Sequence, residues 1–370
     1  MTPRYLFLCP AQRAPSGGIA VIYECVNQLV AAGYSAAVLH EITGVSYENT
    51  PHRPPIMTTS IFRRKDFSFR ISLRHPLQIL NKVIAGLRLL KRRVFVPNND
   101  LASLSADDVI VVPDYLLDYV ARTVPTQPKV LLSQNSFLHL DSYGRAISAG
   151  YDPNAGLVWA VGINQTTLDA IKVLAACPAS KVVVCPNLLM FDFSVTKRRQ
   201  IAYMPRKRPE EAVFIEHLLR QRGKLDGFEL VAVDGMPQAE VARILRESLV
   251  FISLMRNEAL GFPAIEAMAA GCVVVGYTGL GTQEYFDSTT GIPIVEGDTV
   301  GVVAAVEGIV AEYQADSGRL DAMRQFASES VRHRFRSDQF VSGLLESWAQ
   351  IDATLKSTAT NRETTLQATG

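Results

Sequence analysis

The chain has 370 residues, about twice the size of a typical domain, so its length alone predicts two domains. Hydrophobic residues make up 48% of it and charged residues 20%, which permits large buried cores and excludes a wholly disordered chain. Because 37 Lys and Arg residues balance 36 Asp and Glu residues, the net charge of +1 gives no overall attraction to nucleic acid, and we expect no nucleic-acid partner.

The start of the chain and its cysteines both favour a cytoplasmic location. Residues 1–4 lead directly into an apolar run, residues 5–9, which has the length of a strand and not of a signal peptide. No run of about 18 apolar residues lacks a charge, so we expect no membrane-spanning helix. The cysteines are scattered and odd in number, which is typical of reduced cysteines in a core rather than of disulfides or a zinc site.

Short apolar runs alternate with helical segments along most of the chain. In the first half, the strand-like runs are residues 6–9, 36–40, 109–112, 129–132, 158–163 and 182–184. In the second half, they are residues 200–204, 228–233, 250–254 and 273–277, with helical segments that begin near Pro209, Pro237 and Pro263. Continuous apolar strands separated by helices predict parallel sheets that are covered on both faces.

A polar, basic segment, residues 196–199, separates the two series of strands, and we place the domain boundary beside it. Residues 300–355 are predicted to be helical. Residues 357–370 show no periodicity, so we expect them to be a tail without regular structure.

Residues 51–100 differ in charge from the rest of the chain. They contain 11 Lys and Arg but 2 Asp, a local net charge of +9, so the remaining residues carry −8. Between residues 77 and 90, apolar residues recur at helical spacing and are interleaved with basic ones, which predicts a basic amphipathic helix. Two interpretations stay open: a domain helix with a basic polar face, or a surface that contacts anionic lipid head groups or a phosphate-bearing acceptor.

The most informative stretch, residues 253–275, holds two glutamates around a predicted strand-to-helix turn. Glu258 follows the strand at residues 250–254, and Glu266 lies about one turn into a helix that begins near Gly261. Ligands of open α/β sheets bind at this edge, where a helix N-terminus offers free N–H groups to an anion. Because an ionised carboxylate accepts hydrogen bonds from sugar hydroxyls, the arrangement predicts a nucleotide-sugar site. Alternatively, Glu258 caps the turn and Glu266 is a solvated helix residue.

This stretch resembles the E-x7-E signature of retaining glycosyltransferases of family four, which have the GT-B fold, with Glu258 and Glu266 at the two matching positions. Residues 278–286 are similar to that family's glycine turn and following glutamate. Residues 15–19 are similar to its glycine loop after the first strand. The resemblance implies an α/β protein in which two Rossmann-like domains face each other across a cleft.

The resemblance also assigns a part to each region of the chain. The predicted parts are an acceptor-side domain at 1–187, a hinge at 188–199, a domain that binds the nucleotide-sugar at 200–338, a helix at 339–356 that crosses back to the first domain, and the tail at 357–370.

In the family, the second glutamate binds the donor ribose and the first contacts the transferred sugar, which implies these roles for Glu266 and Glu258. Glu258 is therefore the candidate catalytic residue. Backbone groups from both domains would approach the donor diphosphate, at Gly17, Gly18, Gly261 and Phe262. Asn135 and His139, which follow a strand of the first domain, are candidate sugar contacts.

The leaving nucleoside diphosphate needs positive charge in the transition state. The sequence has no Asp-x-Asp motif for a metal, so we expect no metal and no other cofactor. Arg206 and Lys207, just after the strand at residues 200–204, are the candidate cations, and a solvated basic turn is the alternative. The family separates its Arg and Lys within a glycine-bearing motif, and residues 204–209 depart from that pattern. Which of Arg206, Lys207 and Arg208 faces the phosphates therefore stays open.

The resulting prediction is a retaining, metal-independent glycosyltransferase that moves a sugar from a nucleotide-diphosphate donor to a glycan or lipid-linked acceptor in polysaccharide assembly. Residues 51–100 would contact the inner face of an anionic membrane. Two alternatives remain: a sugar-nucleotide 2-epimerase of the same fold, and a non-catalytic paralogue that binds nucleotide or carbohydrate. The sequence has no P-loop, no G-x-S-x-G and no G-x-G-x-x-G motif.

Overall fold

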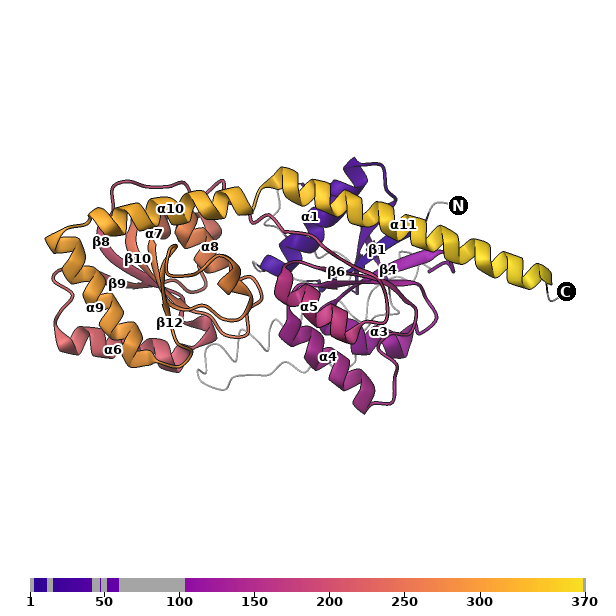
Figure 1. Ribbon diagram of the computed structural model, residues 1–370, viewed down its shortest axis with the longest axis horizontal. Coiled ribbons are helices and arrows are strands. Elements are labelled where there is room, and N and C mark those ends of the chain that lie inside the picture. Colours follow the sequence, from indigo (N-terminus) through magenta and orange to yellow (C-terminus); the bar gives the residue numbers. More distant parts are fainter. Residues whose placement is uncertain (1–2, 12–15, 42–46, 48–51, 60–103, 369–370) are drawn as a thin grey trace, which may run out of the picture.

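The computed structural model shows two α/β domains side by side, joined by a linker and by a long C-terminal helix (Figure 1). It describes residues 3–11, 16–41, 47, 52–59 and 104–368. The predicted basic amphipathic helix between residues 77 and 90 lies outside the described residues. In the part of the chain that is described, no helix is both long enough and apolar enough to cross a membrane.

The first domain is built on a parallel sheet of seven strands in the order β3-β2-β1-β4-β5-β6-β7. Its strands are β1 Arg4–Leu8, β2 Ala36–His40, β3 Ile56–Thr58, β4 Asp108–Pro113, β5 Lys129–Ser133, β6 Leu157–Gly162 and β7 Ala179–Lys181. Its helices are α1 Gly17–Ala31, α3 Leu117–Thr123, α4 Ser136–Ser148 and α5 Gln165–Leu174. Successive residues of β1 enter two different cores: Tyr5 and Phe7 pack on the α1 side, and Leu6 and Leu8 on the α3 side.

The last strand of this sheet differs from the prediction. We expected residues 182–184, but β7 ends at Lys181. Val182 and Val184 are buried in the core, and the N–H of Val182 still donates to the backbone oxygen of Gly162 in β6 at 2.9 Å. The apolar run therefore begins at the end of the strand instead of spanning it.

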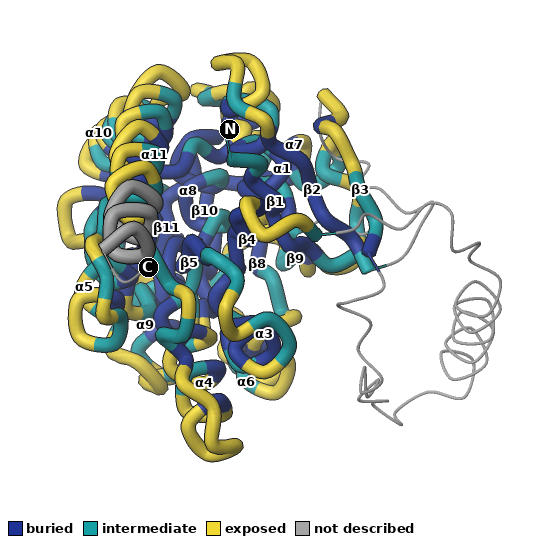
Figure 2. Tube along the Cα trace, turned by 90° about the vertical axis from the view of Figure 1, so that its right-hand side faces the viewer, coloured by how far each residue is buried: buried dark blue, intermediate teal, exposed yellow. Residues whose placement is uncertain are grey.

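The second domain has a parallel sheet of five strands in the order β12-β11-β10-β8-β9. Its strands are β8 Arg198–Tyr203, β9 Glu229–Ala232, β10 Ser248–Leu254, β11 Val273–Tyr277 and β12 Ile292–Ile294. Its helices are α6 Pro209–Arg222, α7 Gln238–Glu247, α8 Phe262–Ala269, α9 Thr299–Ala315 and α10 Gly318–Arg334, and short 3-10 turns occupy Pro205–Lys207 and Gly281–Glu284. Figure 2 shows buried residues along the strands and exposed residues on the outer helix faces. The predicted parallel, doubly covered sheets are confirmed in both domains.

The segment predicted as a hinge, residues 188–199, is partly fixed to the second domain. β8 already begins at Arg198, so the end of this segment belongs to the sheet. The ammonium of Lys197 donates hydrogen bonds to the backbone oxygens of Leu245, Arg246 and Ala270. Because three carbonyls hold it, Lys197 anchors the linker to the second domain.

Helix α11, Ser337–Ala368, follows α10 and lies along the first domain (Figure 1). Trp348 is fully buried and stacks on Phe7 of β1, with ring centroids 5.5 Å apart and an angle of 12° between the planes. The Tyr5 hydroxyl forms a hydrogen bond with Asp352. The helix continues to Ala368, so the expectation of a tail without regular structure from residue 357 was wrong.

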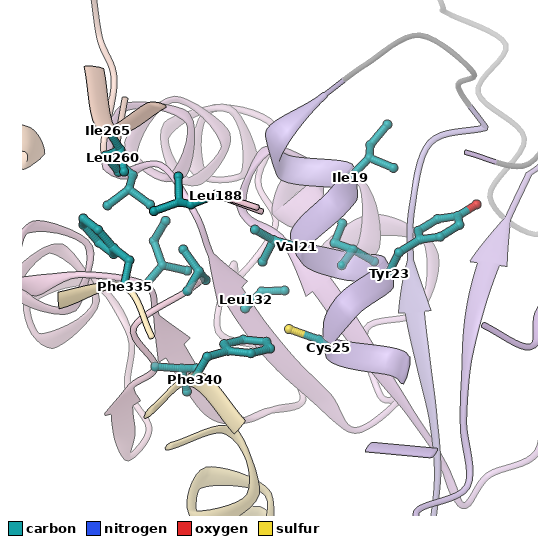
Figure 3. Close-up of a cluster of buried hydrophobic side chains, with 14 of the residues drawn as sticks. Ile19, Val21, Tyr23, Cys25, Leu132, Leu188, Leu260, Ile265, Phe335 and Phe340 are labelled. Atoms are coloured by element: carbon teal, nitrogen blue, oxygen red, sulfur yellow. The ribbon is translucent and has the colours of Figure 1, made fainter. Parts of the chain in front are cut away.

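One apolar cluster continues from the first domain into the second (Figure 3). Ile19 and Val21 of α1 belong to it, as do Leu188 of the linker and Ile265 of α8. Phe335, at the crossing between α10 and α11, is buried in the same cluster. The two domains therefore share buried apolar surface beside the linker, which stabilises their relative placement.

Candidate active site

Glu258 lies in the loop that follows β10, at the carboxyl edge of the second sheet. Its carboxylate forms an ion pair with Lys207, with 2.9 Å between Nζ and Oε1. Lys207 comes from the 3-10 turn after β8, the strand next to β10 in the sheet. Because parallel neighbours end at the same edge, two residues about fifty positions apart meet there. The structure thus brings together the predicted catalytic glutamate and one predicted cation.

Glu266 lies on α8, one turn beyond the helix N-terminus. Its side chain is partly buried, and no other described residue forms a hydrogen bond or ion pair with it. Burial raises the pKa of its carboxyl to about 8. An unpartnered carboxyl at the helix end can accept hydrogen bonds from a ligand's hydroxyls.

The turn before α8 requires glycine. Gly261 has a φ of 67°, in the left-handed region, and a Cβ there would lie 2.2 Å from the sulfur of Met255 and 2.8 Å from Thr282. The Tyr285 hydroxyl donates to the backbone oxygens of Leu260 and Gly261 and holds the turn in place. The backbone at Gly261 and Phe262 therefore keeps one fixed conformation beside Glu258.

The three adjacent cations have different surroundings. The guanidinium of Arg208 is buried: it donates to the Met255 carbonyl at 3.0 Å, forms ion pairs with Glu211 and Glu296, and lies 4.7 Å from the ring centroid of Tyr277. Arg208 is therefore a structural residue. Arg206 and Lys207 are exposed.

Gly17 and Gly18 begin α1 in the first domain and lie close to other side chains. A Cβ at Gly17 would lie 2.9 Å from a ring carbon of Phe262, across the domain interface. A Cβ at Gly18 would lie 3.3 Å from the amide oxygen of Gln134. The missing side chain at Gly17 therefore allows the second domain's Phe262 to approach α1 closely.

Asn135 and His139 lie in very different environments. Asn135 is the N-cap of α4, where its Oδ1 accepts from the N–H of Phe137, and its Nδ2 donates to the backbone oxygen of Asn257 at 2.9 Å. His139 is 1% exposed and lies against the edge of Tyr143. Burial lowers the pKa of His139 to about 4, so the ring is neutral. The expected sugar contact of His139 is corrected: its ring has no surface to offer a sugar in this structure.

Asp114 was not predicted as a site residue. It directly follows β4, and its buried carboxyl accepts from the backbone N–H groups of Gln134 at 2.7 Å and Asn135 at 2.5 Å. Burial raises the pKa of Asp114 to about 7 against the opposing effect of these hydrogen bonds. The carboxyl fixes the turn after β5 that carries Asn135. The sequence feature that could have indicated Asp114 is a single aspartate directly after an apolar strand.

Two further residues, Asn164 and the Glu284 that follows the glycine turn, have an interface role that the sequence did not predict. Asn164, which follows β6, donates through Nδ2 to the backbone oxygen of Ala259 at 2.5 Å. Glu284 of the second domain accepts from the backbone N–H of Gln165 at 2.7 Å and forms an ion pair with Arg334 at 2.9 Å. Polar contacts from both domains therefore surround the Glu258 loop.

Within the described ranges, no group of three or more His, Cys, Asp or Glu side chains could hold a metal ion. The five cysteines are free, and Cys9, Cys25 and Cys272 are buried.

Comparison with known proteins decides the class of activity. Residues 215–317, which include Glu258 and Glu266, match the family model described as glycosyl transferases group 1. The alpha-1,6-glucosyltransferase of Actinobacillus pleuropneumoniae serotype 7 (strain AP76) is 25% identical over 262 residues, which span 65% of this chain and 74% of that protein. The chain is a glycosyltransferase.

Solved structures with the same architecture show that this glycosyltransferase has the GT-B fold. Sucrose-phosphate synthase from Thermosynechococcus elongatus superposes with a TM-score of 0.61 at 14% identity, over 95% of this chain and 99% of that one. TarM of S. aureus superposes with a TM-score of 0.60 at 10% identity, over 95% of this chain and 100% of that one. HepE of Anabaena superposes with a TM-score of 0.54 at 13% identity, over 96% of this chain and 100% of that one.

Proposed function

We propose that this glycosyltransferase is a retaining, metal-independent enzyme that moves a sugar from a nucleoside diphosphate to a glycan or lipid-linked acceptor. The ion pair between Lys207 and Glu258, together with the unpartnered carboxyl of Glu266 on the helix that follows the same loop, carries the proposal. A cation and two carboxyl groups near one sheet edge support it, with the roles of binding the diphosphate, the sugar and the ribose proposed for them. The neighbouring domain contacts the same loop through Asn135.

Each residue has a separate task in this proposal. Glu266 binds the ribose hydroxyls, and Glu258 orients the transferred sugar. Arg206 and Lys207 stabilise the negative charge that grows on the diphosphate as the bond from the anomeric carbon to the phosphate oxygen breaks. These two cations supply the charge that a metal supplies in other transferases.

The reaction proceeds on one face of the sugar. The acceptor oxygen attacks the anomeric carbon from the side that the diphosphate leaves, and the departing phosphate oxygen takes the acceptor's proton. One carbon–oxygen bond breaks and one forms, so neither a side-chain nucleophile nor a separate base is needed.

We propose glucose as the transferred sugar, because the curated relative is a glucosyltransferase. The enzyme is incubated with UDP-, GDP-, ADP- and dTDP-glucose without acceptor, and slow transfer to water is followed by proton NMR. A retaining enzyme with an α-linked donor releases α-glucose first. Release of the β-anomer first contradicts retention, and a nucleoside diphosphate released with a 2-epimeric sugar identifies an epimerase instead.

The basic segment at residues 51–100 supports a second part of the proposal, which concerns the acceptor. Its net charge of +9 favours docking at the inner face of an anionic membrane or contact with a lipid-linked phosphate acceptor. Co-sedimentation with anionic vesicles should weaken as salt rises, because salt screens exposed charges. Equal recovery with neutral and anionic vesicles contradicts membrane docking.

A further inference from the structure

Two asparagines of the first domain hold the backbone on either side of Glu258. Asn135 donates through Nδ2 to the carbonyl of Asn257 at 2.9 Å, and Asn164 donates through Nδ2 to the carbonyl of Ala259 at 2.5 Å. Both hydrogen bonds cross from the first domain to the second. The residues immediately before and after Glu258 are therefore both fixed by the opposite domain.

Each of these asparagines is also the N-cap of a helix in its own domain. The Oδ1 of Asn135 accepts from the first turn of α4, and the Oδ1 of Asn164 accepts from the N–H of Thr167 at 2.9 Å in a capping box of α5. Because the oxygen is occupied by the cap, the NH₂ group must point away from the helix, toward the second domain. Asp or Ser caps a helix as well as Asn does. Only Asn adds a donor with this reach, so the residue type is explained by the contact across the interface.

The contact at Asn164 has no free space around it. Asn164 is 3% exposed. A Cβ on Gly281 would lie 1.8 Å from the Ala259 carbonyl oxygen and 2.7 Å from the Asn164 nitrogen, so a side chain at position 281 would break this hydrogen bond. The adjacent Gln165 N–H donates to Glu284 at 2.7 Å. The start of α5 is therefore docked firmly beside the Glu258 loop.

We infer that Asn135 and Asn164 are positioning residues that hold Glu258 at the reaction centre only while the two domains are in this arrangement. This rests on the proposed role of Glu258 in contacting the transferred sugar. Lys207 fixes the Glu258 side chain from within the second domain, whereas the backbone is fixed from the first. Separation of the domains breaks both asparagine hydrogen bonds and releases the loop. Binding of the nucleoside at Glu266, within the second domain, does not depend on them.

Backbone hydrogen exchange of residues 256–261 tests this directly, in the full-length protein and without any ligand. The variants are Asn135→Asp and Asn164→Asp, which keep the helix caps but lose the donor, and Asn135→Ser and Asn164→Ser, which cap without adding charge. Gln165→Ala is the matched control, because its side chain contacts Asp169 and Lys181 of its own domain. We expect exchange to be about ten-fold faster in the asparagine variants than in the parent protein. In the control variant, the exchange rate should equal that of the parent. Unchanged exchange in all four asparagine variants overturns the inference.

Kinetics then separate positioning from a merely structural contact. We expect kcat to fall about ten-fold in the asparagine variants, while the Kd for the nucleoside diphosphate stays within about two-fold. Faster exchange with unchanged kcat overturns the positioning role. If the unmodified enzyme turns over no nucleotide-sugar, the proposed function fails, whereas the exchange experiment still decides whether the asparagines hold the loop.

Discussion

Lys207 Nζ lies 2.9 Å from Glu258 Oε1, in an ion pair that links the carboxyl ends of two neighbouring strands, β8 and β10. Both side chains remain partly open to solvent, with 43% and 25% of their surface exposed. The pair is therefore able to exchange its internal contact for contacts to a ligand, the cation to a phosphate and the carboxylate to a sugar hydroxyl.

Loss of either member of this pair should reduce turnover strongly. We expect Glu258→Gln and Lys207→Ala each to lower kcat by roughly 100-fold, because each removes a charge aimed at the transition state. Lys224→Ala is the control, since Lys224 is itself exposed and forms an ion pair with Glu307 at 3.5 Å on another part of the domain. Near-normal kcat in Glu258→Gln would rule out its assigned role.

Glu266 should make the ligand-free protein less stable as pH rises. Burial raises the pKa of its carboxyl to about 8 from 4.5, so the folded state holds the proton more tightly than the unfolded state does. Its contribution to stability is therefore complete below pH 4.5 and is lost as pH rises toward 8. Glu266→Gln should have a higher Tm than the parent at pH 8 and a similar Tm at pH 4.5. If the Tm of Glu266→Gln differs from that of the parent by the same amount at both pH values, the raised pKa is contradicted.

The same carboxyl should make nucleotide affinity depend on pH. A ribose donates two hydroxyl protons and so favours the ionised form of Glu266. We expect the Kd of the nucleoside diphosphate, measured by calorimetry, to fall as pH rises toward 8. The fall should be larger than in Glu266→Gln, where only the titration of the phosphate changes the Kd. Parallel pH profiles in the two proteins would show that Glu266 does not contact the ligand.

Arg206 and Arg208 should separate binding from stability. Arg208→Ala leaves the Met255 carbonyl without its donor and Glu211 and Glu296 without their partner, and we expect it to cost roughly 1–3 kcal/mol in the free energy of unfolding. Arg206→Ala removes an exposed cation, so its Tm should stay close to the parent value while nucleoside diphosphate binding weakens. Thermal unfolding with and without the nucleotide measures both effects. The opposite assignment, with binding lost only in Arg208→Ala, would contradict the site.

Trp348 should be the main anchor of α11 on the first domain. It is fully buried and stacks on Phe7, so Trp348→Ala should cost roughly 3–5 kcal/mol in unfolding free energy. The control is Phe326→Ala on α10, where the ring is 52% exposed and the cost should be small. Denaturant unfolding compares them, and equal stability of both variants would show that α11 is held elsewhere.

The architecture was predictable because apolar runs report burial on both faces of a parallel strand. Runs such as residues 250–254 and 273–277 lie in β10 and β11 of the structure. The same signal misplaced β7, which lies at residues 179–181, because the buried Val182 and Val184 follow the end of that strand. The end of α11 was missed because its last residues have no apolar stripe, although no proline interrupts the helix.

The site was only partly predictable, because partners distant in sequence decide each role. Three adjacent cations look alike in sequence, and contacts of Arg208 with residues distant in sequence, Met255, Tyr277 and Glu296, show which one is structural. The burial of His139 likewise depends on packing that local spacing does not encode. Asn164 was invisible as a site residue because N-capping alone explains an asparagine there.

Thermal unfolding against UDP, GDP, ADP and dTDP, in the parent protein and in Glu266→Ala, tests the nucleotide site most directly. A ligand at 100 times its Kd adds about 2.7 kcal/mol of stability, which gives a clear shift in Tm. The account predicts that one nucleotide raises the Tm and that the shift is lost in Glu266→Ala. A shift that persists unchanged in the variant, or no shift with any of the four nucleotides or their glucose conjugates, would contradict it.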